Sequence, residues 1–481
     1  MHVRLGSLAL LLLALVAAAA QQPGAALKEP VGEIPGAVVV GTPTEAVRAE
    51  FVDLAGGKKA KLVVVAKEDA ALESWKKHEV AALSWAKAGK GDAPALEGAT
   101  GVWFDGAAAG DAAPLRRILE RGGAVGGTTG LGSVDGLGLV PGVLFGDQHT
   151  LLAKHPGFFA VRLPEHGAVV FKGRRLKVIG DGAAEIVQAA GGGKPASTRS
   201  VKAGDLTDVI AQSRSAVARS QPAFPPAKLA EPLVPKGTLI IGGGGGMGAD
   251  VWQRFLDAAG GKDGLIVVVP TALEDPQLRD IGEVKSLTRA GAKNVKVLHT
   301  RDRAEANKPE FAALLKDAKG VWFSGGRQWR FVDAYAGTLT EQGFHDVLAR
   351  GGVIGGSSAG ASIQSEYMPR GDPLGNLNII AEGYERGFGF LKGAAVDQHF
   401  FVRKRTADMT QLMKTYPQLL GIGIDESTTI IVQGPIMEVV GKTKAAVYDT
   451  RKPAKDGKDY EEVPTGAKYD LVKRQRVDAV K

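Results

Sequence analysis

A serine stands between glycines at the point where a predicted strand gives way to a predicted helix. The apolar run 352–354 is typical of a short buried strand, and Gly356-x-Ser358-x-Gly360 follows it. Small residues on both sides of Ser358 allow a sharp turn that raises one hydroxyl before the segment 361–366, which can open a helix. There, free backbone N–H groups and the helix dipole favour a developing oxyanion. We therefore predict that Ser358 is a nucleophile and not merely part of a glycine-rich turn.

Candidates for a base and an orienting acid follow this serine along the chain. A serine hydroxyl needs both, because it is a weak nucleophile until a base removes its proton. His399 follows the apolar run 393–396, and Asp425 and Glu426 end another strand-like segment. Each candidate lies where a strand meets a loop, which is the usual place of chemistry in a parallel α/β sheet. The chain order serine, histidine, acid differs from the serine, acid, histidine order of α/β-hydrolases.

Four separated motifs, at 322–326, 355–361, 397–400 and 421–426, resemble those of cyanophycinase and its serine-peptidase relatives, which include aspartyl dipeptidases. The resemblance covers roughly residues 236–475. It implies that Ser358 is the nucleophile and His399 the base, with Glu426 orienting the histidine and Asp425 as the second choice. It implies oxyanion N–H groups from Gly325, Gly326 and Ala359. The substrate pocket would be lined by Gln328, Asp397, Gln398, Arg403 and Arg405.

The predicted pocket departs from the family pattern. Arg327-Gln328 stands where the family usually has Asp-Gln, and two arginines, Arg403 and Arg405, stand where cyanophycinases tend to have three. We expect Arg327, Arg403 and Arg405 to hold substrate carboxylates. Carboxylates such as Asp397 or Glu366 would face an arginyl group.

An internal repeat organises the chain. Three segments of the first part parallel segments of the second, namely 101–106 with 320–325, 121–130 with 350–359, and 146–149 with 396–399. In the first copy the nucleophile position holds Thr129, the histidine position holds His149, and the segment corresponding to 364–391 is missing. We expect residues 24–200 to form a degenerate, non-catalytic copy; the alternative is a threonine-based hydrolase. A helical and proline-rich linker, 201–235, would lead to the catalytic domain, 236–481.

Strands that alternate with helices predict a mostly parallel, doubly wound α/β sheet in each copy, and the resemblance implies a class I glutamine-amidotransferase-like fold. In the second copy, helical spacing covers 250–259 and 311–317. Strands are expected at 238–242, 265–270, 295–300, 320–323 and 353–355. The segments 436–441 and 445–448 flank a three-residue turn and predict a C-terminal β-hairpin.

The N-terminus has the pattern of a secretory signal, with a basic start, an apolar core at 8–16 and small residues to 20. We expect cleavage before Gln21, a secreted or periplasmic protein, and no membrane association afterwards. The chain contains no cysteine, which excludes disulfides. Its net charge of +8 is spread along the sequence without an aromatic-interleaved basic stripe, so we predict no nucleic-acid partner.

Two other motifs bear on cofactors. Gly243-x-Gly245-x-x-Gly248 fits a dinucleotide fingerprint, but the next strand ends in Pro270-Thr271 where an acidic residue would hold a ribose. A loop that lets substrate approach the backbone is the preferred interpretation. The eight histidines are not paired at three- or four-residue spacing, so we predict neither a metal nor any other cofactor.

These features together favour an exported serine peptidase that cleaves an Asp-rich backbone, such as cyanophycin to Asp-Arg dipeptides, through a Ser-His-Glu triad and an acyl-enzyme. One alternative is a serine dipeptidase that acts on small aspartyl peptides. Another is a secreted binding protein without catalysis. The expected partner is an Asp- and Arg-rich peptide or polypeptide substrate, and the expected assembly is a homodimer or an intrachain pseudo-dimer of the two copies.

Overall fold

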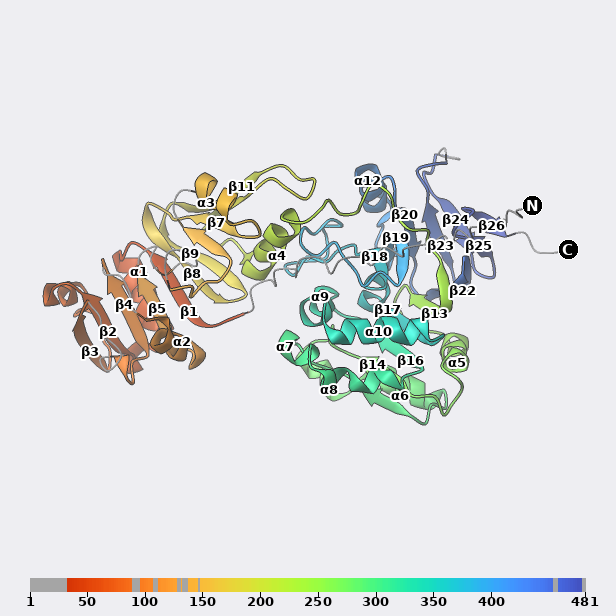
Figure 1. The fold of residues 1–481 in the computed structure, drawn as a ribbon, viewed down its shortest axis with the longest axis horizontal. Coiled ribbons are helices and arrows are strands. Elements are labelled where there is room, and N and C mark those ends of the chain that lie inside the picture. The colour runs from red at the N-terminus through yellow and green to blue at the C-terminus, as the bar shows by residue number, and fades with distance from the viewer. Residues whose placement is uncertain are drawn as a thin grey trace, which may run out of the picture.

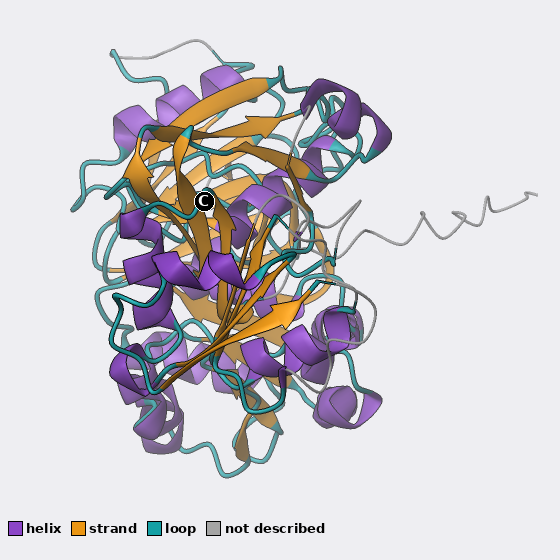
Figure 2. Cartoon of the chain, turned by 90° about the vertical axis from the view of Figure 1, so that its left-hand side faces the viewer, coloured by secondary structure: helices purple, strands orange, loops and turns teal. Residues whose placement is uncertain are grey.

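The computed structural model describes residues 33–88, 96–106, 111–127, 131, 137–145, 148–452 and 457–477. The described chain forms an α/β protein with a large and a small sheet in each of two parts. We call residues 33–219 the N-terminal half and residues 234–477 the C-terminal half; they lie side by side in Figure 1. Figure 2 shows helices on both sides of the strands. The predicted signal, Thr129 and the side chain of His149 lie outside the described residues.

The large sheet of the C-terminal half has the strand order β15-β14-β16-β17-β13-β21-β22-β25-β26. Its parallel strands are β13 (Val234–Gly242), β14 (Ile266–Val269), β15 (Val295–Val297), β16 (Gly320–Phe323) and β17 (Val353–Ser357). The antiparallel strands β21 (Thr428–Gly434), β22 (Ile436–Gly441), β25 (Lys468–Asp470) and β26 (Gln475–Val477) extend it. The central strands are buried along their length because helices cover both faces.

One face of this sheet packs on α5 (Ala249–Ala258) and α6 (Gly282–Arg289). The other face packs on α9 (Trp329–Tyr335) and α10 (Leu339–Ala349). The helices α7 (Arg303–Ala306) and α8 (Pro309–Ala312) precede β16, and a 3-10 turn from Ala313 to Lys316 follows α8, so the helix expected at 311–317 is divided in two.

The small sheet of the C-terminal half has the order β18-β19-β20-β23-β24. It consists of β18 (Ser365–Tyr367), β19 (Leu391–Gln398), β20 (Leu420–Ile424), β23 (Lys444–Tyr448) and β24 (Glu461–Pro464), with α12 (Thr406–Thr415) packed on it. The expected hairpin of 436–441 with 445–448 is wrong, because β22 pairs with β21 and β25 while β23 pairs with β20 and β24. Both strands instead bury apolar side chains in one core between the two sheets. Met437 of β22 and Val447 of β23 are examples.

The N-terminal half has a large sheet of order β12-β9-β8-β1-β5-β4-β2-β3 and a small sheet of order β11-β10-β7-β6. Its large sheet contains β1 (Ile34–Gly41), β2 (Lys61–Ala66), β3 (Ala82–Lys87), β4 (Gly101–Asp105), β5 (Ala124–Gly127), β8 (His166–Gly173), β9 (Arg175–Asp181) and β12 (Thr207–Asp208). Its small sheet contains β6 (Val143–Phe145), β7 (Phe159–Arg162), β10 (Ala183–Gln188) and β11 (Ser197–Lys202). Its α-helices are α1 (Glu45–Leu54), α2 (Ala112–Glu120), α3 (Gln148–Lys154) and α4 (Val209–Arg219).

The strands of the two large sheets are arranged in the same order relative to their order in the sequence. From its edge strand, the first reads β3-β2-β4-β5-β1-β8-β9, and the second reads β15-β14-β16-β17-β13-β21-β22. In both, the first strand of the half pairs in parallel with one neighbour and antiparallel with the other.

The segment predicted as a linker, 201–235, contains the end of β11, β12 and α4 (Val209–Arg219). In Figure 1, α4 lies between the two halves. The proline-rich stretch then leads to β13, which begins at Val234. Within the described part of the chain, no helix is long and apolar enough to span a membrane.

Candidate active site

Ser358 occupies a tight turn between β17 and the short helix α11 (Ala359–Ser362), with φ 56° and ψ −113°. A non-glycine residue rarely adopts positive φ, and such conformations gather at functional sites. Gly360, two residues after Ser358, is required sterically, because a Cβ at this position would lie 2.8 Å from the carbonyl carbon of Phe323. The need for glycine in the turn inferred from the sequence therefore has a direct cause, because the backbone of Phe323 occupies the space that a side chain at position 360 would fill.

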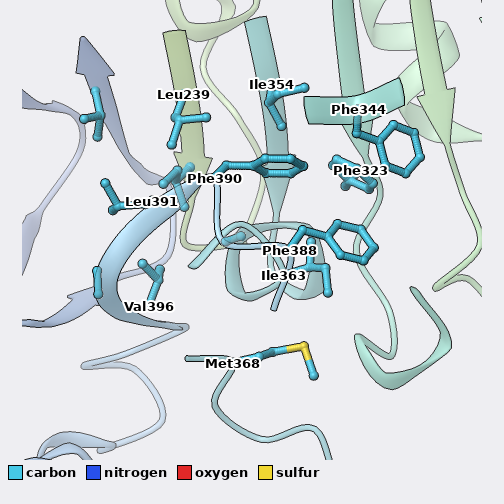
Figure 3. Close-up of a cluster of buried hydrophobic side chains, with 14 of the residues drawn as sticks. Leu239, Phe323, Phe344, Ile354, Ile363, Met368, Phe388, Phe390, Leu391 and Val396 are labelled. Carbon is cyan, nitrogen blue, oxygen red and sulfur yellow. The ribbon is translucent and has the colours of Figure 1, made fainter. Parts of the chain in front are cut away.

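A dense apolar core fixes this turn from below. Figure 3 shows Ile354 of β17 and Ile363, just after α11, among the rings of Phe323, Phe388 and Phe390. The side chains of Ile354 and Ile363 have no exposed surface, and the three phenylalanines pack at ring-centroid distances of 5.7 to 6.1 Å. Because interiors are packed as closely as organic crystals, the strand and the helix cannot shift independently of each other.

The three residues of the predicted triad lie together. The Oγ atom of Ser358 is 2.9 Å from Nε2 of His399, and Nδ1 of His399 is 2.6 Å from Oε1 of Glu426. His399 follows β19 and Glu426 follows β20, so the histidine and the glutamate come after strands of the small sheet, whereas the serine comes after a strand of the large one. This is the order of contacts in which a carboxylate orients an imidazole that can accept the serine proton.

Asp425, the other carboxylate left open by the sequence, points elsewhere. Its Oδ1 atom accepts the backbone N–H groups of Phe401 and Val402 at 3.1 and 3.0 Å. The side chain is buried, with 6% of its surface exposed. It stabilises the loop that follows the histidine, while Glu426 contacts the ring.

The environment of His399 disfavours its charged form. Burial lowers the pKa of the imidazole, the hydrogen bond that the ring donates to Glu426 raises it, and the positive charge of Arg403 lowers it further; the net pKa lies below the ordinary value of 6.5. A neutral imidazole is the form that accepts a proton.

The glycine run after β13 contacts all parts of this arrangement. A Cβ on Gly244 would lie 2.6 Å from Nε2 of His399, and one on Gly245 would lie 2.7 Å from Cβ of Glu426. We expected this loop to let substrate approach the backbone; the space beside these two glycines is instead filled by the side chains of His399 and Glu426. The glycine-rich fingerprint is thus explained by packing. The run of five glycines was the sequence signal that side chains have no room in this loop.

Three consecutive carbonyl groups of this run also hold the site. The oxygen of Gly242 accepts the N–H of Ser358 at 3.0 Å, that of Gly243 accepts the N–H of His399 at 2.8 Å, and that of Gly244 accepts the N–H of Ser427 at 2.7 Å. All three donors have positive φ, at 56°, 50° and 54° respectively. One stretch of backbone therefore sets the spacing of Ser358, His399 and the loop that carries Glu426.

Two of the three predicted oxyanion residues, Gly325 and Ala359, lie next to Ser358. A Cβ on Gly325 would lie 3.5 Å from Cβ of Ser358, which places the turn after β16 against the serine. Ala359 is the first residue of α11, where backbone N–H groups have no intrahelical acceptor. Gly326 has φ 123° and its Cα faces the backbone of Ala272. Their role as oxyanion donors stays a prediction.

The sequence model of peptidase family S51 matches residues 238–440. Over 216 residues the chain is 32% identical to the cyanophycinase of Geminocystis herdmanii (strain PCC 6308), covering 44% of this chain and 79% of that protein. The chain belongs to peptidase family S51. Over 236 residues this S51 peptidase is 28% identical to the cyanophycinase of Trichormus variabilis (strain ATCC 29413 / PCC 7937), covering 46% of this chain and 78% of the relative. The prediction of a serine-type peptidase is thereby confirmed.

Two solved peptidase structures are similar to parts of this S51 peptidase. A peptidase from an acI-B1 actinobacterium is 24% identical and covers 49% of this chain and 97% of its own, with a TM-score of 0.40. A putative peptidase E protein from Listeria monocytogenes EGD-e is 17% identical and covers 43% of this chain and 98% of its own, with a TM-score of 0.32.

Two of the predicted pocket residues of the S51 peptidase hold a neighbouring segment. The buried Gln328 donates from Nε2 to the carbonyl oxygens of Pro369 and Arg370, at 3.0 and 2.8 Å. The guanidinium of Arg327 donates to the carbonyl oxygens of Asp372 and Gly375, at 2.8 and 3.0 Å. Both side chains follow the Gly325-Gly326 turn, so they fasten the segment 369–375 beside the nucleophile.

Three other predicted pocket residues, Asp397, Gln398 and Arg405, form a buried hydrogen-bonded network. Asp397 lies two residues before His399 in the chain. The carboxylate of Asp397 has no exposed surface and accepts from Nε of Arg370 at 3.0 Å and from the guanidinium of Arg405 at 3.0 Å. Arg405 also donates to the side-chain and backbone oxygens of Gln398, at 3.1 and 2.6 Å. Burial lowers the pKa of Arg405 to about 10, against the favourable charge of Asp397.

Arg370 is a site residue that the sequence analysis missed. Besides Asp397, it binds Asp408 at 2.6 Å and the carbonyl oxygens of Asn376 and Leu377. A usable signal was the aspartate inside the apolar strand β19, because a buried carboxylate requires a cationic or hydrogen-bonding partner.

Of the six predicted pocket residues, Arg403 is the one with an exposed side chain. Glu366, expected to face an arginyl group, accepts the backbone N–H of Gly393 at 2.6 Å. The described residues contain no group of three or more His, Asp or Glu side chains that could hold a metal ion.

Proposed function

We propose that this S51 peptidase hydrolyses an Asp-rich peptide backbone, such as cyanophycin to Asp-Arg dipeptides, through the triad Ser358, His399 and Glu426. The observation that carries the proposal is the chain of contacts at 2.9 and 2.6 Å that joins these three side chains. The substrate class is supported by relatives that are cyanophycinases.

The reaction begins with attack of the Ser358 hydroxyl on the scissile carbonyl carbon, while Nε2 of His399 takes the hydroxyl proton. Glu426 accepts the Nδ1–H bond, which holds the ring in the required tautomer and stabilises the imidazolium that forms. The backbone N–H groups of Gly325, Gly326 and Ala359 stabilise the negative charge that develops on the carbonyl oxygen.

The imidazolium then donates its proton to the leaving amine, and the C–N bond breaks to give an ester on Ser358. Water attacks this acyl-enzyme with His399 again as the base, which releases the acid product and regenerates the hydroxyl. The lowered pKa of His399 keeps the ring neutral near pH 7, so the base is ready before substrate binds.

One predicted pocket residue binds the substrate directly, and the others hold the pocket in shape. Arg403, whose side chain is exposed near the base, binds a substrate carboxylate. The half-buried Arg327 and the buried Gln328, Asp397, Gln398 and Arg405 shape the pocket through their bonds to the backbone and to one another.

We further infer that residues 24–200 are a degenerate, non-catalytic copy of the second domain with a class I glutamine-amidotransferase-like sheet, and that residues 1–20 direct export to a secreted or periplasmic location. The matching strand orders of the two large sheets support the first inference. The basic, apolar and small-residue regions before Gln21 support the second.

The proposal is tested by Ser358→Ala, with the neighbouring Ser357→Ala as the matched control. Hydrolysis of insoluble cyanophycin and of aspartyl dipeptides is followed by product mass. Ser358→Ala should lower the rate by at least about a thousandfold, and the control by less than about tenfold. Equal rates for Ser358→Ala and the parent would exclude this mechanism, while turnover confined to dipeptides would replace the polymer by the smaller substrate.

A serine-directed phosphonate separates the enzyme from a non-catalytic binding protein. Modification of Ser358, located by peptide mapping, requires an activated hydroxyl. A parent protein that stays unmodified and hydrolyses neither substrate would support the binding protein.

A further inference from the structure

A segment between β18 and β19 is hydrogen-bonded to residues on two sides of the candidate active site. We call residues 368–386 the wall segment. The repeated sequence of the N-terminal half has no counterpart of it. The segment is folded back on itself, because the N–H of Met368 donates to the oxygen of Glu385 at 2.7 Å and the N–H of Arg370 donates to that of Ile379 at 3.1 Å.

The inner side of the wall segment is bonded to both flanks of the nucleophile. On one flank, Arg327 and Gln328, just after the Gly325-Gly326 turn, hold its backbone from residue 369 to 375. On the other flank, Arg370 binds Asp397, two residues before the base. A displacement of the wall segment would therefore reach both sides of the site.

The outer side of the wall segment is held by the N-terminal half. Nε and a terminal nitrogen of Arg219 donate to the two carboxylate oxygens of Glu382, at 2.6 and 3.2 Å. The hydroxyl of Ser215 donates to Glu382 at 2.6 Å, and Lys194 donates to Glu385 at 2.6 Å. The donors come from α4 and from the loop before β11, and Figure 1 shows α4 between the halves.

A second cluster ties the same segment to α9. Asp333 of α9 accepts from Arg174 and from Arg214 of the N-terminal half, each at 2.7 Å. Tyr384 of the wall segment donates its hydroxyl to Asp333 at 2.9 Å and accepts from Arg174 at 3.0 Å. The guanidinium of Arg174 also stacks on the ring of Trp329, 4.4 Å from its centroid. Since α9 begins directly after Gln328, this cluster joins the Gln328 flank of the site and the wall segment to the N-terminal half.

The ion pairs of Arg219 with Glu382 and of Lys194 with Glu385 each have one buried partner. The side chains of Arg219 and Glu385 are 6% and 5% exposed, whereas those of their partners Glu382 and Lys194 are 30% and 19% exposed. Buried ion pairs contribute little net stability, but they specify one arrangement because an unpaired buried charge is costly. The contacts are thus suited to fixing the position of a segment.

We propose that the N-terminal half is a built-in positioning domain, whose Lys194, Arg174, Arg214, Ser215 and Arg219 hold the wall segment in the place that substrate binding requires. This inference rests on the proposed function, since the wall matters for peptide binding at Ser358. It gives the non-catalytic half a role in specificity, because an accurately placed wall orients an extended peptide before the chemical step.

The test replaces Glu382 by alanine in the full chain. Glu382 contacts Arg219 and Ser215 of the other half, and its side chain is 30% exposed, so the protein is expected to fold. The matched control is Glu438→Ala, whose side chain is 27% exposed and pairs with Arg254 within the C-terminal half. Ser215→Ala removes one hydrogen bond from the N-terminal side.

For hydrolysis of an aspartyl peptide longer than a dipeptide, Glu382→Ala should lower kcat/KM by at least about tenfold, mainly through KM, and Ser215→Ala by about threefold. The rate at which a small phosphonate modifies Ser358 should stay within about twofold, because that reagent needs the triad but not the wall. Amide hydrogen exchange of residues 368–386 should become faster in Glu382→Ala and not in Glu438→Ala.

Parent-like kcat/KM and parent-like exchange in Glu382→Ala would overturn the inference. An equal loss of peptide hydrolysis and phosphonate modification would also overturn it, because that pattern indicates general damage to the domain. If the parent itself reacts with neither reagent, the proposed function fails, whereas the exchange of residues 368–386 still decides whether the N-terminal half holds the wall segment.

Discussion

Gly244 lies against the imidazole of His399, and its replacement by alanine tests whether the glycine run positions the base. The added Cβ would lie 2.6 Å from Nε2 and 2.8 Å from Nδ1 of the ring. Carbon and nitrogen atoms in ordinary contact are separated by about 3.5 Å or more. The ring must therefore move by about 1 Å, away from the position in which Nε2 lies 2.9 Å from the serine hydroxyl.

The loop itself cannot easily move instead. The oxygens of Gly243 and Gly244 are bound to the N–H groups of His399 and Ser427, at 2.8 and 2.7 Å. A misplacement of about 1 Å in a catalytic group lowers the rate by about a hundredfold. We therefore expect Gly244→Ala to lower kcat/KM by at least about a hundredfold. Because Gly244 has φ 104°, the substitution also carries about 1–3 kcal/mol of backbone strain.

Gly246→Ala is the matched control. Gly246 has a similar φ of 93°, but no atom lies within 4 Å of its added Cβ. Both variants should lose similar stability in thermal unfolding, while Gly246→Ala should keep kcat/KM for an aspartyl peptide within about threefold of the parent. If the two variants were equally active, or equally inactive with equal unfolding midpoints, the contact between Gly244 and the ring would not position the base.

Glu426→Gln should lower kcat for peptide hydrolysis by at least about a hundredfold, because the imidazolium loses its carboxylate partner, while Asp425→Asn should cost less than about tenfold; the reverse ranking would assign the acid to Asp425. For pH, activity requires neutral His399, whose pKa lies below 6.5, so the acid limb of kcat/KM should have its midpoint below pH 6.5. Arg403→Gln removes a positive charge that lowers this pKa, so the limb should move to higher pH; no movement, or movement to lower pH, would contradict the stated electrostatics.

The sequence predicted the α/β class and the candidate site residues, but it did not predict which of the two sheets positions each residue. Ser358, His399 and Glu426 could be proposed because residue types that suit acyl transfer stood at the ends of apolar strands. That the serine comes from the large sheet and the other two from the small one was not visible, since short apolar runs carry no information about which strands pair. The hairpin expected around residues 442–444 is wrong for the same reason.

Arg370 shows a second limit of the sequence. It lies in a polar, glycine-containing stretch without periodicity, so nothing local marks it as buried. Its side chain is nevertheless 2% exposed, because Asp397 on a distant strand requires a cation. Such a residue can be predicted only from its partner, and the partner can be identified only when its own burial is known.

The glycine run after β13 is best explained as a requirement of the triad. Ser358, His399 and Ser427 hold positive φ, which costs about 1–3 kcal/mol for each and persists only where the surroundings enforce it. The enforcing groups are the consecutive carbonyl oxygens of residues 242–244, each bonded to the N–H of one of the three. For these oxygens to reach two loops and the nucleophile turn, the chain must pass directly over the imidazole and the acid, where side chains have no room. Glycine at these positions therefore follows from the geometry of the triad, without any phosphate or nucleotide to explain it.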